Sequence, residues 1–453
     1  MSTASSTPRD YLVVGLGVSG WAAARTLLEL GAKVRVTESS SDAEIERRAE
    51  QLRSAGAAVE TGGHSLERLA ADVAVVSPGI SPASPVVSAL RAAGIPVIGE
   101  IELAWKLARC DFLAVTGTNG KSTTTLLLAE MLRVAGIAST AAGNIGTPLI
   151  DVVRALPEAG AVAVEVSSFQ LDTIEDFRPR VAVILNVAED HTDWHGSFEA
   201  YARAKARVTR NQRSDDVLVV NAEDEHAMEI AQRAAARLVP FATARAPRSG
   251  AGVAEGRILW QGSEVMAVSE VALPGRAGLE DTLAAAAAAL SYGVEAAGVV
   301  EAVRSFVPLP HRLQTVARRH GVSYIDDSKA TNPHATRSAV RGLRDVVLIA
   351  GGRAKGIDLG PLAETVPPVI AVVALGEAAA NVARIFEGLV PVERASSMRE
   401  AVARARRHAT PGGSVLLSPG CASLDMYESY AARGEDFARC VAVELEEKED
   451  AAR

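Results

Sequence analysis

The chain has 453 residues, of which 48% are hydrophobic and 23% charged, and its formal net charge is −8. At about 150 residues per domain, this length predicts roughly three domains, and the apolar share is too high for a disordered chain. The acidic balance argues against a general binder of nucleic acid or of anionic membranes. No run of about 18 uncharged apolar residues predicts a membrane span.

Three cysteines, Cys110, Cys421 and Cys440, lie far apart and match no metal or redox spacing. Such sparse cysteines are typical of a reducing compartment. The first ten residues are small and polar, without the basic start and apolar core of a secretory signal. We therefore expect a cytoplasmic protein.

The first hundred residues alternate short apolar strands with helices, which predicts a parallel α/β unit. Strands are expected at 11–14, 33–37 and 73–76, and helices at 21–30 and 100–108. The motif Gly15-Leu-Gly-Val-Ser-Gly20 lies between the first strand and the first helix, and Glu38 follows the second strand. This spacing is that of a dinucleotide-binding turn, whose backbone N–H groups face a pyrophosphate. By itself the motif leaves NAD(P), FAD, another nucleotide diphosphate and a purely structural turn open.

A second glycine loop, Gly117-Thr-Asn-Gly-Lys-Ser-Thr123, lies between a predicted strand at 112–116 and a predicted helix at 122–135. It ends as a phosphate-binding loop does, with a glycine, a lysine for the β- and γ-phosphates and a hydroxyl for Mg²⁺. Val115 takes the place of the first glycine of the usual pattern, so the match is partial. Two glycine loops on separate units predict a triphosphate on one and a second phosphorylated ligand on the other.

Two polar residues follow neighbouring predicted strands at 161–166 and 181–186. Glu165 ends the first of these strands, where a carboxylate completes the Mg²⁺ shell that Ser122 begins. His191 follows the second strand and is expected at the same sheet edge, where ligands of parallel sheets bind. The alternative is an ordinary core or surface side chain at each position.

Only seven of the 47 basic residues are lysines, and four of those seven fall inside motifs. Lys121 belongs to the second glycine loop. Lys329 and Lys355 follow predicted strands and are expected to bind anions there. Lys205 lies in a stretch of helical composition, and its local context alone predicts a surface lysine.

The rest of the chain predicts a tightly packed alanine-rich helix at 283–290 and then a third α/β unit. Pro308 and Pro310 mark the boundary between them. Strands of the third unit are expected at 323–325, 346–350, 370–375 and 414–418, and the acidic tail at 444–450 is expected to be a solvated helix end.

Taken in order, these motifs resemble the Mur ligase family from Gly15 to about Gly434. The loop at 117–123 is common to Mur ligases and folylpolyglutamate synthetases. Three further motifs resemble the glutamate-adding members: Leu309-Pro-His-Arg312, Asp327-Ser-Lys-Ala-Thr-Asn332 and Ser418-Pro-Gly-Cys-Ala-Ser-Leu-Asp425.

The resemblance implies an α/β protein of three domains. These are a Rossmann-like UDP-substrate domain at 1–108, a central P-loop ATPase-like domain with a parallel sheet at 109–309, and a Rossmann-like glutamate-binding domain at 310–453. The implied activity is that of an ATP-dependent amide ligase, which adds D-glutamate to UDP-N-acetylmuramoyl-L-alanine through an acyl phosphate in peptidoglycan precursor synthesis. The first glycine motif is then expected to bind UDP and not NAD.

The resemblance also implies the role of individual residues. ATP is expected on Gly117, Thr118, Asn119, Gly120, Lys121, Ser122, Thr123, Arg312 and Asp327. Two Mg²⁺ ions are expected on Ser122, Glu165, His191 and Lys205, the last of them carbamylated. The UDP substrate is expected on Gly15, Gly17, Ser19, Glu38, Ser39, Ser77, Asn144, Ser167 and Gln170. Glutamate is expected on Thr331, Lys355, Ser423, Leu424 and Tyr430. The catalytic residues are expected to be Lys121, Glu165, His191, Lys205, His311 and Lys329.

The chain departs from the family pattern in three places. Where the family has a His-Asn pair and a further Asn for adenine, this chain has Ala277, Gly278 and Asp281. Because a carboxylate accepts but does not donate hydrogen bonds, we expect nucleotide selectivity to differ. The other two departures are Arg353-Ala354, where the family often has Asp-Gly, and Gly420.

Several alternatives stay open on the sequence. An NAD(P) oxidoreductase leaves the second glycine loop, Lys329 and Lys355 without a role. A non-catalytic nucleotide-binding module lacks switch-like signatures but fits the altered adenine stretch. Within the ligase interpretation, D-glutamate is favoured over L-glutamate. We expect a monomer whose ligands are small molecules, without nucleic acid or membrane.

Overall fold

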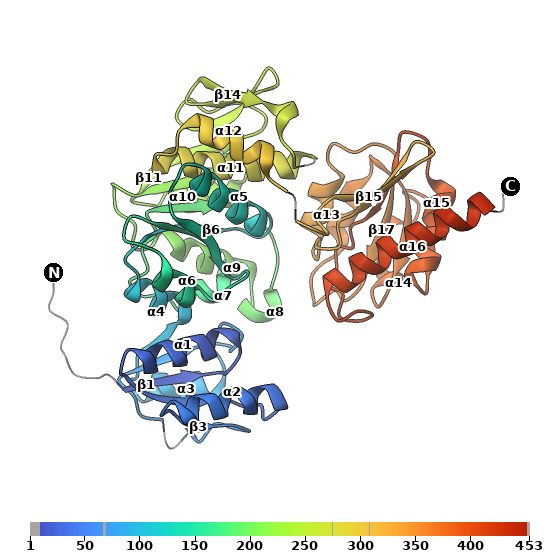
Figure 1. Cartoon of the computed structure of the whole chain (residues 1–453). Coiled ribbons are helices and arrows are strands. Elements are labelled where there is room, and N and C mark those ends of the chain that lie inside the picture. The colour runs from blue at the N-terminus through green and yellow to red at the C-terminus, as the bar shows by residue number, and fades with distance from the viewer. Residues whose placement is uncertain (1–9, 67–68, 274, 308, 451–453) are drawn as a thin grey trace.

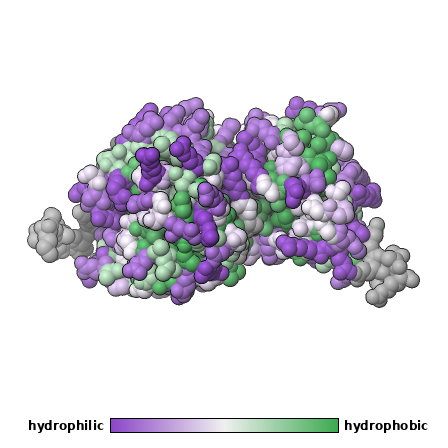
Figure 2. All heavy atoms as spheres, turned by 90° about the horizontal axis from the view of Figure 1, so that it is seen from above, coloured by the Kyte–Doolittle hydropathy of each residue, from purple (hydrophilic) through white to green (hydrophobic). Residues whose placement is uncertain are grey.

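The computed structural model describes residues 10–66, 69–273, 275–307 and 309–450. Their strands form three separate sheets of five, nine and six strands. In Figure 1 the blue N-terminal part lies below the green central part, and the orange C-terminal part lies beside the central part. Seen from above, hydrophilic side chains cover most of the molecule and a notch separates its two lobes (Figure 2). Among the described residues, no helix is long and apolar enough to cross a membrane.

The first sheet is wholly parallel, in the order β3-β2-β1-β4-β5. Its strands are β1 (Asp10–Val14), β2 (Lys33–Thr37), β3 (Ala58–Glu60), β4 (Val73–Val76) and β5 (Val97–Gly99). Its helices are α1 (Val18–Glu29), α2 (Ala43–Ser54), α3 (Pro85–Ala92) and α4 (Glu100–Leu107). The inner strands β1 and β4 carry apolar runs, Leu12–Val14 and Val73–Val76, because helices cover both faces of a parallel sheet.

The central sheet has the order β14-β13-β12-β11-β10-β9-β6-β8-β7. Its strands are β6 (Asp111–Thr116), β7 (Ser139–Gly143), β8 (Ala161–Glu165), β9 (Val181–Ile184), β10 (Val217–Asn221), β11 (Arg237–Ala242), β12 (Ala251–Ala254), β13 (Arg257–Trp260) and β14 (Ser263–Ala267). Its helices are α5 (Lys121–Val134), α6 (Leu149–Ala155), α7 (Ser168–Leu171), α8 (Thr192–His195), α9 (Phe198–Ala206), α10 (Glu225–Ala231), α11 (Gly275–Tyr292) and α12 (Ala296–Ser305), with 3₁₀ turns η2 (Arg207–Thr209) and η3 (Val268–Glu270). The alanine-rich stretch is buried in α11, where small side chains let this helix pack closely on α5.

The third sheet has the order β15-β16-β20-β17-β18-β19. Its strands are β15 (Gln314–Arg319), β16 (Val322–Asp326), β17 (Val346–Gly351), β18 (Val369–Leu375), β19 (Val392–Ala395) and β20 (Ser414–Leu417). Its helices are α13 (Pro333–Val340), η4 (Gly360–Thr365), α14 (Ala379–Phe386), α15 (Met398–His408) and α16 (Tyr430–Asp450). The acidic tail therefore ends a long helix, as its composition predicts.

The three α/β units are confirmed, with one correction to the central and third sheets. They are not wholly parallel, because β12, β13 and β14 pair antiparallel with one another and β15 pairs antiparallel with β16. Antiparallel neighbours need only a short turn, whereas parallel neighbours need a crossover. A second difference lies at β9, which ends at Ile184 and not at Asn186.

Candidate active site

The loop at 117–120 joins β6 to the N-terminus of α5 and requires glycine at both ends. Gly117 has φ 156° and Gly120 has φ 86°, and a side chain at either position would collide with its surroundings. A Cβ at Gly120 would lie 2.2 Å from Oδ1 of Asp281. The loop thus places backbone N–H groups and a helix N-terminus at one sheet edge, which is a site for an anion.

Asn186 braces this loop from the neighbouring strand connection. Its Oδ1 accepts hydrogen bonds from the N–H groups of Thr118 (3.1 Å) and Asn119 (2.8 Å). Its Nδ2 donates to the carbonyl of Asn119 at 3.2 Å. The strand predicted at 181–186 extends over this residue, which has no predicted role. The sequence does carry a signal for this role. Asn186 has an amide side chain and lies directly before the Val-Ala-Glu-Asp-His191 stretch, which contains a predicted metal ligand.

Two lysines share the carbonyl of Gly117. Nζ of Lys121 donates to it at 2.9 Å and Nζ of Lys205 donates to it at 2.6 Å. Lys205 is only 1% exposed and lies over the ring of Tyr201, which corrects the surface position that its local context predicts. Burial, together with Lys121, holds the pKa of Lys205 well below its ordinary value. Burial also lowers the pKa of Lys121.

Glu165 ends β8 beside these lysines and is 2% exposed. Its Oε1 accepts a hydrogen bond from Nδ2 of Asn144 at 2.8 Å, whereas its Oε2 is buried without a hydrogen-bond partner. A buried carboxylate oxygen left without a partner costs free energy, and a cation relieves that cost. The donor chemistry at Glu165 therefore fits Mg²⁺.

Ser122 and His191 are the other predicted metal ligands of the central part. The Ser122 side chain is buried at the start of α5. His191 has φ 52° and packs edge-to-face against Phe169, with ring centroids 4.8 Å apart. Within the described ranges, no three His, Cys, Asp or Glu side chains cluster as a metal site. Mg²⁺ commonly takes one or two carboxylates and completes its shell with water and phosphate oxygens.

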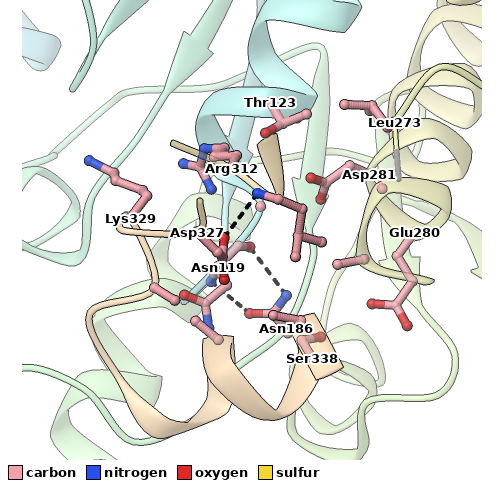
Figure 3. Close-up of a pocket in the computed structure, with 17 residues that line it drawn as sticks. Asn119, Thr123, Asn186, Leu273, Glu280, Asp281, Arg312, Asp327, Lys329 and Ser338 are labelled. Carbon is pink, nitrogen blue, oxygen red and sulfur yellow. Dashed lines mark hydrogen bonds between the residues drawn. The ribbon is translucent and has the colours of Figure 1, made fainter. Parts of the chain in front are cut away.

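A cavity opens between the phosphate loop and the C-terminal part (Figure 3). Arg312, Asp327 and Lys329 line it from the C-terminal side, and Asp281 lines it from α11. Burial raises the pKa of Asp327 to about 7 and that of Asp281 to about 8. Burial, together with Arg312, lowers the pKa of Lys329 to about 8. The cavity thus places charged and neutral polar groups beside the loop.

His311 is not in the lining of this cavity, although its neighbour Arg312 is. Its Nδ1 is 2.7 Å from Oδ2 of Asp326, and its ring lies edge-on to Tyr430. Nζ of Lys329 lies 3.8 Å from the centroid of the same Tyr430 ring. Tyr430 therefore connects the two predicted catalytic residues of the C-terminal part.

A separate cavity lies at the first glycine motif, lined by Gly15, Gly17, Glu38, Ser39 and Ser77 among others. The Glu38 carboxylate accepts from the N–H groups of Leu16 (2.6 Å) and Ser40 (2.8 Å). Burial raises the pKa of Glu38, but hydrogen bonds led by the Ser40 and Leu16 N–H groups hold it below its ordinary value. Ser19 lies in the first turn of α1 and is not in the lining of this cavity.

Comparisons with known proteins bear on the whole chain. The Mur ligase MurD-like N-terminal domain matches residues 9–99, the Mur ligase middle domain residues 115–289, and the Mur ligase glutamate ligase domain residues 311–421. The UDP-N-acetylmuramoylalanine--D-glutamate ligase of Desulfosudis oleivorans is 42% identical over 100% of both chains. That of Frankia casuarinae is 43% identical over 95% of this chain and 93% of its own. The chain belongs to the Mur ligase family.

Solved Mur ligases share this three-part fold. The UDP-N-acetylmuramate-alanine ligase of Thermotoga maritima covers 98% of this chain and 100% of its own, with 20% identity and a TM-score of 0.56. The pseudomurein peptide ligase type C of Methanothermus fervidus covers 96% and 100%, with 18% identity and a TM-score of 0.60. These likenesses extend to the fold alone.

The remaining residues expected from the Mur ligase resemblance are spread more widely. Ser167 and Gln170 are buried and hydrogen-bond to each other in a capping box at the start of α7. Ser423 is 4% exposed, whereas Leu424 is 55% exposed. Lys355 lies exposed on a loop with φ 54°.

Paired backbone bonds between Arg353 and Ala422 bring the loops of Lys355 and Ser423 together. Thr331 is half-buried beside Asn332. None of the five residues expected to bind glutamate lines the cavity of Figure 3. These are Thr331, Lys355, Ser423, Leu424 and Tyr430.

Proposed function

We propose that this chain is an ATP-dependent ligase that joins D-glutamate to UDP-N-acetylmuramoyl-L-alanine, working as a cytoplasmic monomer in peptidoglycan precursor synthesis. The observation that carries the proposal is the cavity that the phosphate loop bounds on one side and Arg312, Asp327 and Lys329 bound on the other. Full-length relatives at 42–43% identity support the choice of substrates.

The chemistry follows from the weakness of a carboxylate as an electrophile. The alanine carboxylate attacks the γ-phosphorus of ATP and displaces ADP, and the acyl phosphate that forms has phosphate as a good leaving group. Lys121 and the N-terminus of α5 hold the phosphate oxygens and offset their charge, which is mainly a task of positioning and electrostatics. The glutamate amine then attacks the acyl carbon, the nitrogen gives up a proton, and phosphate leaves as the amide forms.

Residues of the C-terminal part are suited to the second step. Lys329 and Arg312 are cations beside the loop and stabilise the negative charge of the acyl phosphate and of the tetrahedral intermediate. His311, fixed by Asp326, orients the nearby Tyr430 ring. Thr331, Lys355, Ser423, Leu424 and Tyr430 would hold glutamate, with Lys355 on a carboxylate as a point charge.

We assign Mg²⁺ to Glu165, His191 and Ser122, where it would neutralise phosphate oxygens. Lys205 is proposed as the carrier of a further, carbamate ligand for a second ion. Its lowered pKa favours the neutral form of the amine, and a neutral amine attacks the carbon of CO₂ and releases a proton to form that carbamate. The change converts a cation into an oxygen ligand, which arginine cannot imitate.

The UDP end of the substrate is assigned to the first cavity, with Gly15, Gly17, Ser19, Glu38, Ser39 and Ser77. Three further residues assigned to this substrate belong to the central part: Asn144 follows β7, and Ser167 and Gln170 follow β8, the strand that Glu165 ends. Asn144 is bonded to Glu165 itself, so it connects the substrate path to the metal site.

The test is phosphate release with ATP, Mg²⁺ and UDP-N-acetylmuramoyl-L-alanine, run with D-glutamate, L-glutamate or no amino acid. Release only with D-glutamate, together with the amide product by mass spectrometry, is the expected result. Release only with L-glutamate would keep the mechanism and change the substrate. No release from folded chain would overturn the proposal.

Two variants, measured in the same phosphate-release assay, test the proposed roles of Lys121 and Lys205. Lys121→Ala is expected to abolish phosphate release, and full activity in this variant would remove the loop assignment. Lys205→Ala is expected to lose activity and to regain part of it with small carboxylates. Unchanged turnover in Lys205→Ala would exclude Lys205 from the site.

A further inference from the structure

The phosphate loop is held from two sides by two different parts of the molecule. Asn186 of the central part binds the backbone of Asn119, as described above. The side chain of Asn119 points the other way and bonds to the first turn of α13 in the C-terminal part. Asn119 is therefore a joint between the loop and the C-terminal part.

Two residues at the start of α13, its N-cap Asn332 and His334, make this contact. Asn332 caps the helix by accepting from the N–H of Ala335 at 2.9 Å, and it exchanges two amide bonds of 3.3 Å with Asn119. Its Nδ2 also lies 3.0 Å from Oδ2 of Asp190. Nδ1 of His334 lies 2.9 Å from Nδ2 of Asn119.

The chemistry of the His334 contact is restricted. An amide nitrogen only donates, so Nδ1 of His334 must accept and the imidazole must be neutral. Burial, aided by Arg337 and Arg341, lowers the pKa of His334 to about 4, which keeps the ring neutral at physiological pH. The same helix supplies Ala335, Ser338 and Ala339 to the wall of the cavity in Figure 3.

We propose that His334 is a positioning residue that fixes the Asn119 side chain of the phosphate loop, so that nucleotide affinity depends on the docking of α13. The inference rests on the nucleotide site of the proposed function. Loss of this hydrogen bond removes one restraint on the Asn119 side chain, and it weakens nucleotide binding without touching the reacting atoms.

The test compares two variants of similar size. In His334→Asn the side-chain oxygen occupies the place of Nδ1 and still accepts from Asn119. In His334→Leu the same space is filled without an acceptor. Thr336→Ser, on the same helix but outside the cavity lining, is the control.

ADP affinity by calorimetry and steady-state phosphate release are measured for each full-length chain. His334→Leu is expected to weaken ADP binding and to raise the KM for ATP by about fivefold, the size of one net hydrogen bond, with kcat nearly unchanged. His334→Asn and Thr336→Ser are expected to bind ADP as the native chain does. Thermal unfolding confirms that each variant is folded.

Native ADP affinity in His334→Leu would overturn the proposal, and so would equal losses in the Asn and Leu variants. Absence of ADP binding to the native chain would instead overturn the nucleotide site itself. The two failures are thus distinguishable in one experiment.

Discussion

Asp281 shows how a single side chain can tune the nucleotide site. It is 9% exposed, it lies against Gly120 of the loop, and burial raises its pKa to about 8. Below that pH the carboxyl is neutral and both donates and accepts, as an amide does. Above it, a negative charge lies beside the phosphates.

The KM for ATP is therefore expected to rise by about tenfold between pH 7 and pH 9, a cost of about 1.4 kcal/mol. Asp281→Asn should remove most of this rise, because an amide does not ionise. Glu280→Gln is the control, since Glu280 lines the same cavity but is paired with Arg276. An equal rise in Asp281→Asn would assign the pH dependence to another group.

Asn186 acts on the same loop through its backbone. Asn186→Ala leaves the N–H groups of Thr118 and Asn119 without their acceptor, and we expect the KM for ATP to rise by about tenfold. Asn211→Ala removes side-chain bonds to two backbone carbonyls in another connection and serves as the control. If both variants have the native KM, the loop does not depend on this brace.

At the scale of elements, α16 approaches the His311–Asp326 pair so closely that only glycine fits at the contact. A Cβ at Gly434 would lie 2.2 Å from Nδ1 of His311 and 2.5 Å from Oδ2 of Asp326. We expect Gly434→Ala to destabilise the chain by about 1–3 kcal/mol and to lower turnover, because the helix must shift or the pair must separate.

Gly298→Ala is the matched control for Gly434→Ala. Gly298 also lies inside a helix, but a Cβ there would make only ordinary contacts, the nearest at 3.5 Å. Alanine has the higher helix propensity, so this variant should be as stable as the native chain or more so. Thermal denaturation compares Gly434→Ala with Gly298→Ala. Equal stability of the two variants would show that α16 shifts to accept the Cβ without a loss of stability.

Elements were also the scale at which the sequence was most informative. Strands and glycine loops depend on neighbouring residues, so β2 and β4 begin and end where the pattern predicts. The burial of Lys205 depends on Tyr201 and on the distant carbonyl of Gly117, and its local composition carries no sign of either. The contact of His334 with Asn119 joins residues 215 positions apart, and only the packed fold reveals it.

At the scale of the whole molecule, the buried carboxyl group of Glu100 helps to join the N-terminal part to the central part. Glu100 begins α4, which follows β5 and packs on α6 of the central part. The side chain is 3% exposed and accepts from the N–H of Ile150 at 2.8 Å. Burial raises the pKa of Glu100 to about 7.

Because the pKa is higher in the folded chain than in the unfolded one, the folded state keeps its proton over the window from about pH 4 to pH 7. The contribution of Glu100 to the free energy of unfolding therefore falls as pH rises through this window and is constant above it. The total change is roughly 3 kcal/mol at about 1.4 kcal/mol per pKa unit. Glu100→Gln has no such dependence, since its amide keeps the acceptor and does not ionise.

Thermal denaturation of both chains across this window measures the difference. We expect the stability of the native chain relative to Glu100→Gln to be greatest at acidic pH and to decline toward neutrality. Glu158→Gln, an exposed substitution, corrects for the loss of one acid from the total charge. A difference that is the same at every pH would mean that Glu100 has the same pKa folded and unfolded. The join would then have to hold a charged carboxylate, which the burial of Glu100 makes unfavourable.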